Sequence, residues 1–310
     1  MPLLESVPNV SEGRDAGRIE RMAGALASVP GAHLLHRTSD FDHHRTVFTL
    51  AGEPEPLLEA LLALYSIAVV EIDLRAHRGV HPRAGAVDVA PLVPLAGARM
   101  ADAVAASERL GEEIARRFGL PVYLYERSAC SSERRALPDV RRGGFEGFAG
   151  KMLDPAWVPD FGPRRVHPSA GVAIVGAREI LVAWNVVLET DDVAVARAVA
   201  RAVRAATPGG LPAVRAIGVP LARLGRAQVS MNLLDYRITS MAQAFERVAR
   251  EAARLGTRPV ASELIGLAPA AALPPDAERT LLLPDPSEQI LEVRLNAAGL
   301  PSEIEGESSP

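Results

Sequence analysis

The loop that contains His77 and His81 holds the densest group of side chains that could carry out chemistry. Arginines surround both histidines, at positions Arg75, Arg78 and Arg83. Imidazole titrates near neutral pH, and nearby cations lower its pKa, so a histidine among arginines stays basic at pH 7 and can transfer protons. The forked donors of the arginines suit the carboxylates of a small acidic substrate. The alternatives are histidines that only form hydrogen bonds within a turn and arginines that are only solvated.

His77 and His81 also have the i, i+4 spacing of a metal-binding pair on a helix. However, Gly79 disfavours a helix, and Pro82 pushes His81 toward an extended conformation. The His-Glu-x-x-His motif of metalloproteases is absent from the sequence. We therefore favour proton transfer over metal binding and expect no metal.

Two further segments combine polar or aromatic side chains. The first is a predicted β-turn, which we expect to be solvated and which contains Asp40, Asp42, His43, His44 and Arg45. The second, residues 157–171, is rich in glycine and proline, which fix the backbone and let main-chain groups approach a flat ligand. Trp157 or Phe161 could stack on such a ligand. The pattern alone favours a rigid linker between domains.

Composition excludes several other chemistries. The chain of 310 residues has one lysine, Lys151, and one cysteine, Cys130. A structural disulfide needs two thiols, a zinc ribbon needs four, and a Schiff-base enzyme would have to use Lys151. The serines beside Cys130 are not part of a Gly-x-Ser-x-Gly motif. A net charge of −4 and a pI near 6.0 lack the basicity typical of nucleic-acid-binding domains, so we expect small molecules or proteins as partners.

The sequence also indicates the location of the protein and its number of domains. The first residues have neither the basic nor the apolar region of a signal peptide, and no apolar stretch reaches the roughly 18 residues that suggest a membrane span. We therefore expect a soluble, cytoplasmic protein without a membrane partner. The length suggests roughly two domains.

The elements that must hold these groups follow a βαββα order in the first half, which then continues with a strand, a helix and a strand. Apolar periodicity predicts a strand at 3–8, a helix at 14–28, strands at 32–36 and 45–51, a helix at 54–70, a strand at 86–95, a helix at 100–118 and a strand at 122–125. Ser11 or Asp15 could cap the first helix. Residues 127–171 read as a long irregular connection, which makes them a candidate binding loop.

From Gly171 the pattern restarts and gives a second βαββαβ-like half. We expect strands at 172–175 and 180–188, a helix at 191–205, strands at 214–219 and 228–234, a helix at 240–255, a strand at 259–261 and a frayed tail at 296–310. The fold class is therefore α+β, with two ferredoxin-like subdomains. We place the subdomains at residues 1–177 and 178–300, followed by a tail at 301–310.

Several stretches of the chain together resemble those of one enzyme family. They are Val7–Asp15, Arg45–Thr49, His81–Val89, Val122–Tyr125, Asp160–Pro163 and Asn232–Asp235. In this order they resemble glutamate formimidoyltransferase, also called formiminotransferase, and the resemblance spans about residues 3–300. It corresponds to the single-enzyme form, without a cyclodeaminase domain.

The resemblance implies a transferase in histidine degradation and one-carbon metabolism. The family moves the formimino group from N-formimino-L-glutamate to N5 of tetrahydrofolate, which is a co-substrate, and needs no metal. It also implies a ligand cleft between the two subdomains. The same resemblance implies a homodimer with formiminoglutamate and folate as its small-molecule partners.

The resemblance also assigns site residues. It places the catalytic histidine of the His-Pro-Arg block at His81 and not at His77. Its folate-binding loop falls on Gly162, Pro163, Arg164, Arg165, Val166, His167, Pro168, Ser169, Ala170 and Gly171. Weaker candidates are Asn9, Arg45 and Arg83.

The chain departs from the family pattern at a few positions. His44 replaces the usual asparagine before Arg-Thr-Val, Ala170 replaces the vertebrate aromatic residue before the last glycine of the loop, and His167 replaces an apolar residue. Two alternatives therefore stay open. One is formyl transfer between 5-formyltetrahydrofolate and glutamate, and the other is a non-catalytic folate-binding module, against which the undisturbed His-Pro-Arg block argues.

Overall fold

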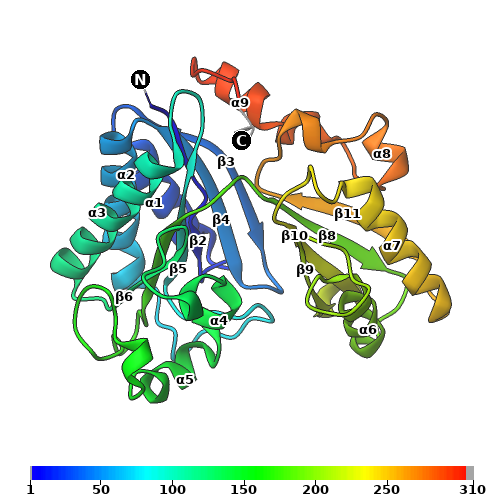
Figure 1. The fold of residues 1–310 in the computed structure, drawn as a ribbon, viewed down its shortest axis with the longest axis horizontal. Coiled ribbons are helices and arrows are strands. Elements are labelled where there is room, and N and C mark those ends of the chain that lie inside the picture. The colour runs from blue at the N-terminus through cyan, green and yellow to red at the C-terminus, as the bar shows by residue number, and fades with distance from the viewer. Residues whose placement is uncertain (1, 305–310) are drawn as a thin grey trace. The chain divides into compact units, whose positions relative to one another are not determined.

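The computed structural model describes residues 2–304, which form two compact units (Figure 1). The N-terminal unit contains residues 2–178 together with 303–304, and the C-terminal unit contains residues 179–302. Each unit has its own sheet and its own hydrophobic core. None of the helices within residues 2–304 combines the length and the apolar character that a bilayer span requires.

The N-terminal unit is built on a seven-stranded sheet. Its strands are β1 (Leu4–Ser6), β2 (Asn9–Val10), β3 (Ala32–Asp40), β4 (Arg45–Gly52), β5 (Val87–Pro94), β6 (Val122–Glu126) and β7 (Ala173–Ala177). Both β1 and β2 pair with β4 on one side and β5 on the other, so they act as one interrupted strand. With β3 on the outer side of β4, the antiparallel order is that of a ferredoxin-like βαββαβ unit, which confirms the predicted fold class.

Three further elements extend this unit beyond the predicted motif. Helix α3 (Met100–Phe118) leads from β5 to β6, and β7 inserts between these two strands, parallel to both. The prediction that the second half begins with the strand at 172–175 was wrong, because this segment completes the first sheet. Its register pairs Ala90 with Val175 and Leu124 with Val175. A central strand buried on both faces is a short apolar run that does not reveal its partners.

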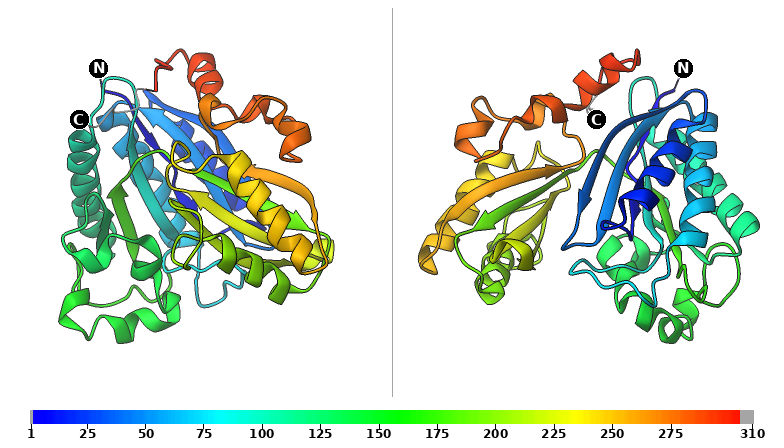
Figure 2. Two further views of the ribbon diagram at one scale, coloured as in Figure 1. Left: turned by 45° about the vertical axis from the view of Figure 1, so that its right-hand side comes forward. Right: turned by 180° about the vertical axis from the view of Figure 1, so that it is seen from behind.

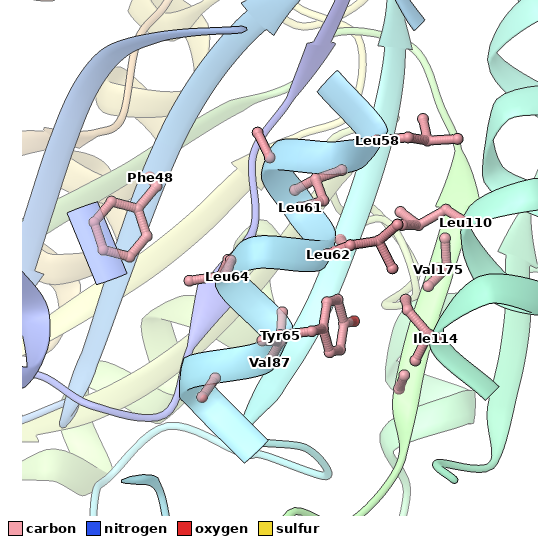
Figure 3. Close-up of a cluster of buried hydrophobic side chains, with 14 of the residues drawn as sticks. Phe48, Leu58, Leu61, Leu62, Leu64, Tyr65, Val87, Leu110, Ile114 and Val175 are labelled. Carbon is pink, nitrogen blue, oxygen red and sulfur yellow. The ribbon is translucent and has the colours of Figure 1, made fainter. Parts of the chain in front are cut away.

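The three long helices of the N-terminal unit cover one face of its sheet (Figure 2). They are α1 (Ala16–Ala27), α2 (Pro54–Glu71) and α3. Asp15 caps α1 by accepting a hydrogen bond from the Arg18 backbone N–H, as one of the two predicted caps. Figure 3 shows leucines of α2 beside Leu110 and Ile114 of α3 and Val175 of β7. This apolar layer fixes one end of the loop that follows α2.

The opposite face, over β5, β7 and β6, is covered by residues that we predicted to be irregular. They include two 3-10 turns, Ser132–Arg134 and Pro155–Trp157, and two short helices, α4 (Leu137–Arg141) and α5 (Gly144–Lys151). Val140 and Phe148 from these helices pack on Tyr123 and Tyr125 of β6 in a second small core. The prediction of an irregular connection was thus wrong for these parts. Helices of one or two turns are too short to produce a clear apolar period.

The C-terminal unit has a four-stranded antiparallel sheet in the order β11-β8-β10-β9. Its elements are β8 (Val182–Leu188), α6 (Val193–Val203), β9 (Val214–Leu221), β10 (Arg226–Leu233), α7 (Met241–Arg254) and β11 (Pro259–Ile265). This is again the ferredoxin-like order, and both helices cover one face of the sheet around the buried Trp184 (Figure 2). A capping box between Ser240 and Gln243 starts α7.

Past β11 the chain forms two short helices that were not predicted, α8 (Ala277–Thr280) and α9 (Leu291–Ala297). Leu281 and Leu283 belong to the core of the C-terminal unit, and Leu291 and Leu295 are also buried. The prediction of a frayed tail from residue 296 was therefore wrong at its start, because Asn296 lies in α9. The last part of the predicted tail, residues 305–310, lies outside the described residues.

Candidate active site

His81 lies in the loop between α2 and β5, and this loop is fastened at both ends to the predicted folate-binding loop. The Leu74 backbone N–H donates to the Ser169 carbonyl at 2.8 Å, and the Ala86 N–H donates to the Ala170 carbonyl at 2.9 Å. Between these anchors the chain has no regular secondary structure over residues 77–84, so hydrogen bonds from side chains must fix it.

His77 provides hydrogen bonds of this kind. It is buried, its Nε2 lies 2.9 Å from the His44 carbonyl oxygen, and its Nδ1 accepts a hydrogen bond from Arg83 Nε at 3.1 Å. Burial, followed by the electrostatic effects of His44 and Arg83, lowers the pKa of His77 to about 4, so the ring is neutral at pH 7. Both ring nitrogens are engaged, which leaves neither free for a metal or a substrate.

His44 joins the turn before β4 to the same loop. Its ring stacks on that of His77, Nδ1 lies 3.1 Å from the Arg78 carbonyl oxygen, and Nε2 lies 3.1 Å from Glu12 Oε1. Burial disfavours the charged Glu12 carboxylate, but hydrogen bonds from His44, from backbone N–H groups and from Arg18 outweigh this and hold its pKa well below the usual range. The backbone of His44 is left-handed, with φ 52°, a conformation that asparagine adopts readily.

Asn9, Arg45 and His81, all nominated from the sequence, lie in contact. Arg45 Nε donates to Asn9 Oδ1 at 2.8 Å, and Arg45 Nη1 approaches His81 Nδ1. Asn9 and Arg45 come from the neighbouring strands β2 and β4 and share the sheet face opposite the helices. The expectation of a solvated turn at residues 40–45 was wrong for His43 and Arg45, which are buried because β4 enters the sheet at Arg45.

Asp88 on β5 completes this group and was not among the nominated residues. Its Oδ2 accepts a hydrogen bond from Arg45 Nη2 at 2.8 Å and forms an ion pair with Arg141 Nη2 at 2.7 Å, and its Oδ1 accepts from the Ala84 backbone N–H at 2.8 Å. The last bond holds the chain three residues beyond His81. The sequence could have nominated Asp88, because it is a carboxylate inside the apolar run of β5. Arg141 comes from helix α4, which was not predicted.

The surroundings of His81 keep its imidazole neutral. The ring is half-buried, and burial, then the charges of Arg45 and Arg141, hold its pKa well below the usual value. Its Nδ1 lies 2.8 Å from the Pro82 carbonyl oxygen. When Nδ1–H donates to this carbonyl, Nε2 keeps the lone pair that can accept a proton.

Arg83, the remaining weak candidate, does not join this group. Its guanidinium pairs with Glu146 of α5, with Arg83 Nη2 to Glu146 Oε1 at 2.7 Å, and contacts His77. Arg83 therefore fastens the loop to α5 and lies on the His77 side of it.

The predicted folate-binding loop, residues 162–171, has a glycine at each end that the backbone requires. Gly162 and Gly171 have φ angles of 84° and 75°, and a Cβ at either residue would overlap a backbone carbonyl oxygen, of Leu120 and Ala84 respectively. The interpretation of residues 157–171 as a linker between domains was wrong, because Phe161 pairs with Val122 and the whole segment lies in the N-terminal unit.

Within this loop the side chains differ in exposure. Gly162, Arg164, Arg165 and Pro168 are exposed, whereas Ala170 is buried. The departures from the family pattern have local explanations. His167 Nδ1 accepts from the Ala170 backbone N–H at 3.0 Å, so it closes the turn, and Ala170 fills a core position.

Comparison with known proteins identifies the family. A model described as the formiminotransferase domain, N-terminal subdomain, matches residues 3–178, and a model of the formiminotransferase domain matches residues 183–281. The chain belongs to the formiminotransferase family. Glutamate formimidoyltransferase of Streptococcus pyogenes serotype M1 is 43% identical over 295 residues, which are 94% of this chain and 98% of the relative.

Two further relatives match most of this chain. Glutamate formimidoyltransferase of Thermoplasma acidophilum is 41% identical over 275 residues, 88% of this chain and 90% of the relative. Formimidoyltransferase-cyclodeaminase of Sus scrofa is 38% identical over 312 residues, which are 97% of this chain but 57% of the relative.

The candidate site thus brings together a neutral histidine, the buried Arg45 and Asp88, and the largely buried Arg141. In residues 2–304 no group of three or more His, Cys, Asp or Glu side chains is arranged to hold a metal ion. The arrangement can accept and return a proton at His81 and can bind an anion at its guanidinium groups.

Proposed function

We propose that this protein transfers the formimino group from N-formimino-L-glutamate to N5 of tetrahydrofolate, as a glutamate formimidoyltransferase in histidine degradation. The observation that carries the proposal is the 43% identity to the streptococcal enzyme of that name over 94% of this chain and 98% of the relative. Tetrahydrofolate is the co-substrate in this reaction and receives the one-carbon unit.

The reaction needs one group that moves a proton twice. N5 of tetrahydrofolate attacks the formimino carbon, and the C=N electron pair moves to the imino nitrogen, which gives a tetrahedral intermediate. N5 loses its proton as the new N–C bond forms. The C=N bond then reforms, the bond from carbon to the glutamate nitrogen breaks, and that nitrogen leaves with a proton. The products are 5-formiminotetrahydrofolate and glutamate.

His81 is the proposed proton carrier. Its lowered pKa keeps it neutral at pH 7, so it can take the proton from N5 at Nε2 and return it to the glutamate nitrogen. Nδ1 lies 2.8 Å from the Pro82 carbonyl oxygen, and in the tautomer whose Nδ1–H donates to this oxygen the lone pair that the role requires is at Nε2. Arg45 lies against the same ring and is itself held by Asn9 and Asp88.

We assign folate binding to residues 162–171. The support is the family resemblance, the rigid glycine at each end of the loop and the exposure of Gly162, Arg164 and Pro168. The end of the loop that carries Ser169 is bonded to Leu74, at the start of the His81 loop, which supports a ligand site shared by the two loops.

Oligomeric state and location belong to the same proposal. We infer a cytoplasmic homodimer from the family resemblance. Sedimentation equilibrium of the purified protein tests the dimer, and a monomer at the concentrations used for assay would refute it.

The decisive experiment incubates the purified protein with formiminoglutamate and tetrahydrofolate and follows 5-formiminotetrahydrofolate by its conversion in acid to the methenyl form. We expect product with wild-type protein and little with His81→Ala. Parallel reactions pair glutamate with 5-formyltetrahydrofolate, which distinguishes formimino from formyl transfer. If folded protein forms no product from the formimino donor, the assignment is wrong.

A further inference from the structure

The group around Asp88 carries an excess of buried positive charge. Arg45 and Arg141 both direct Nη2 at Asp88 Oδ2, at 2.8 Å and 2.7 Å. The side chains of Arg45, Arg141 and Asp88 are only 9%, 13% and 1% exposed. Within residues 2–304, Asp88 is the one carboxylate that either guanidinium meets. The other partners of Arg45 are neutral groups of Asn9, His81 and Pro82.

One carboxylate therefore faces two guanidinium groups, and the balance is one uncompensated positive charge. Burial of an unpaired charge is unfavourable, and proteins offset it with a counter-ion or a bound ligand. Burial, with the charge of Arg141, already lowers the pKa of Arg45 to about 10, which leaves the group protonated at neutral pH. The excess positive charge of the two arginines is therefore present at neutral pH, and a bound anion would neutralise it.

Arg141 still has unused donors. Its Nη2 pairs with Asp88, while its Nε is buried without a hydrogen-bond partner among the described residues. A guanidinium presents five N–H donors in a planar fork that matches a carboxylate. An anion bound here would pair with Arg141 and complete its hydrogen bonds.

We propose that Arg141, together with Arg45, binds the α-carboxylate of the formimino donor next to His81 and selects this substrate. This inference rests on the proposed function. In formiminoglutamate the α-carboxylate is attached to the carbon that carries the leaving nitrogen, so it must lie beside the group that protonates that nitrogen. The carboxylates of folate are separated from N5 by the benzoyl ring and are too remote for this position.

Donor binding then prepares His81 for its role. The charged and titratable groups around the ring are Arg45 from β4, Arg141 from α4, Asp88 from β5 and His43 from the turn before β4. A bound carboxylate offsets the two cations, so the imidazole holds a proton more readily in the complex than in the free enzyme. The apparent pKa for kcat should therefore lie above the apparent pKa for kcat/KM.

The test measures carboxylate binding without turnover. NMR follows the imidazole signal of His81, assigned by its loss in His81→Gln, during pH titrations with and without glutarate as the probe. We expect glutarate to raise the pKa of His81 in wild-type protein and to have no effect in Arg141→Gln. Arg142→Gln is the matched control, because Arg142 is the next residue, is 78% exposed and pairs with Asp139.

Kinetics supply a second measurement. Arg141→Gln should raise KM for formiminoglutamate about tenfold or more and change KM for tetrahydrofolate less than about twofold. The substitution removes a charged hydrogen-bond partner from the formiminoglutamate site and leaves the folate site unchanged. Arg141→Lys, which keeps the charge but not the fork, should give an intermediate KM. If Arg141→Gln does not fold, Arg141→Lys decides by the same comparison.

Two results would overturn the inference. One is a glutarate effect on His81 that is as large in Arg141→Gln as in wild type, and the other is an equal rise of KM for both substrates. Wild-type protein that binds glutarate but forms no product would refute the proposed reaction instead and leave the carboxylate site standing. The two failures are therefore distinguishable.

Discussion

The rings of His44 and His77 stack face to face, with centroids 4.1 Å apart and an angle of 9° between their planes. The backbone carbonyl of His44 is also bound by His77 Nε2, so the two residues are linked through ring and main chain. Through this pair the turn before β4 holds the loop that carries His81. The relationship separates the two histidines of that loop into an anchor, His77, and the proposed proton carrier, His81.

His77→Phe tests the anchor. Phenylalanine can keep the stacking but loses both hydrogen bonds, so we expect the free energy of unfolding to fall by about 1–3 kcal/mol. At a temperature where the variant is folded, the pH midpoint of kcat/KM should stay at the wild-type value. Chemical denaturation and a pH–rate profile measure the two effects. A shifted midpoint with unchanged stability would contradict the assignment.

The pH dependence of wild-type activity tests the proton carrier. Because burial and the neighbouring arginines lower the pKa of His81, its neutral form predominates at pH 7 and is lost only as the pH falls through the lowered value. We expect kcat/KM to be constant around neutrality and to decline with a midpoint below 6.5, the ordinary value for histidine. Profiles from about pH 5 to about pH 8 check this. A midpoint above that value would argue against His81.

Glu5 in β1 gives a prediction about stability. It is buried, and burial raises its pKa from 4.5 to about 7, although the charge of Arg178 opposes the shift. The folded state then binds more protons than the unfolded state between these values, so this group favours folding at low pH, and that contribution is lost as the pH rises through about 7.

Glu5→Gln removes this cost of ionisation. We expect it to stabilise the protein by about 3 kcal/mol at about pH 8 and to have little effect near pH 4. Urea denaturation at the two pH values measures the difference. Glu108→Gln, at an exposed position of α3, is the control and should show no such pH dependence. Equal effects of Glu5→Gln at both values would exclude ionisation as the cause.

Gly162→Ala tests the geometry of the proposed folate loop. The substitution combines a φ of 84° with an overlap between Cβ and the Leu120 carbonyl oxygen. We expect a loss of more than about 1 kcal/mol in stability and weaker folate binding. Gly147→Ala in α5 is the matched control, because nothing lies within 4 Å of its added Cβ. Thermal unfolding and titration with 5-formyltetrahydrofolate measure both variants, and unchanged folate affinity in Gly162→Ala would separate this end of the loop from the ligand.

Sequence predicted the fold wherever an element had its own periodic signal. The long helices α2 and α3 and the order of elements in the C-terminal unit follow from apolar spacing, which is a local property. The membership of β7 in the first sheet is not local, because its partners β5 and β6 lie in other parts of the chain. The short helix α4 has too few residues for a period to emerge.

The same distinction holds for the candidate site. His81 and Arg45 stand in stretches that resemble one family, and this resemblance nominates them. The chemistry of the residues alone does not separate His81 from His77. Arg141 lies among several arginines of one segment, and only the folded chain shows that it turns toward Asp88 while Arg142 stays in solvent. Sequence alone could not choose Arg141 from this run of arginines, because the choice depends on which face of a short helix it occupies. It also depends on a partner more than 50 residues away in sequence.

The place of β7 between β5 and β6 also bears on how the protein is made. This strand is the last part of the N-terminal sheet to be synthesised, yet it fills the gap between strands made long before it. Until Ala173–Ala177 has left the ribosome, β5 and β6 have no common neighbour and expose their inner edges. The segment just before β7 carries the backbone bonds to Leu74 and Ala86. A nascent chain that already contains His81, Asp88 and Arg141 should therefore lack an ordered site until this late strand is inserted.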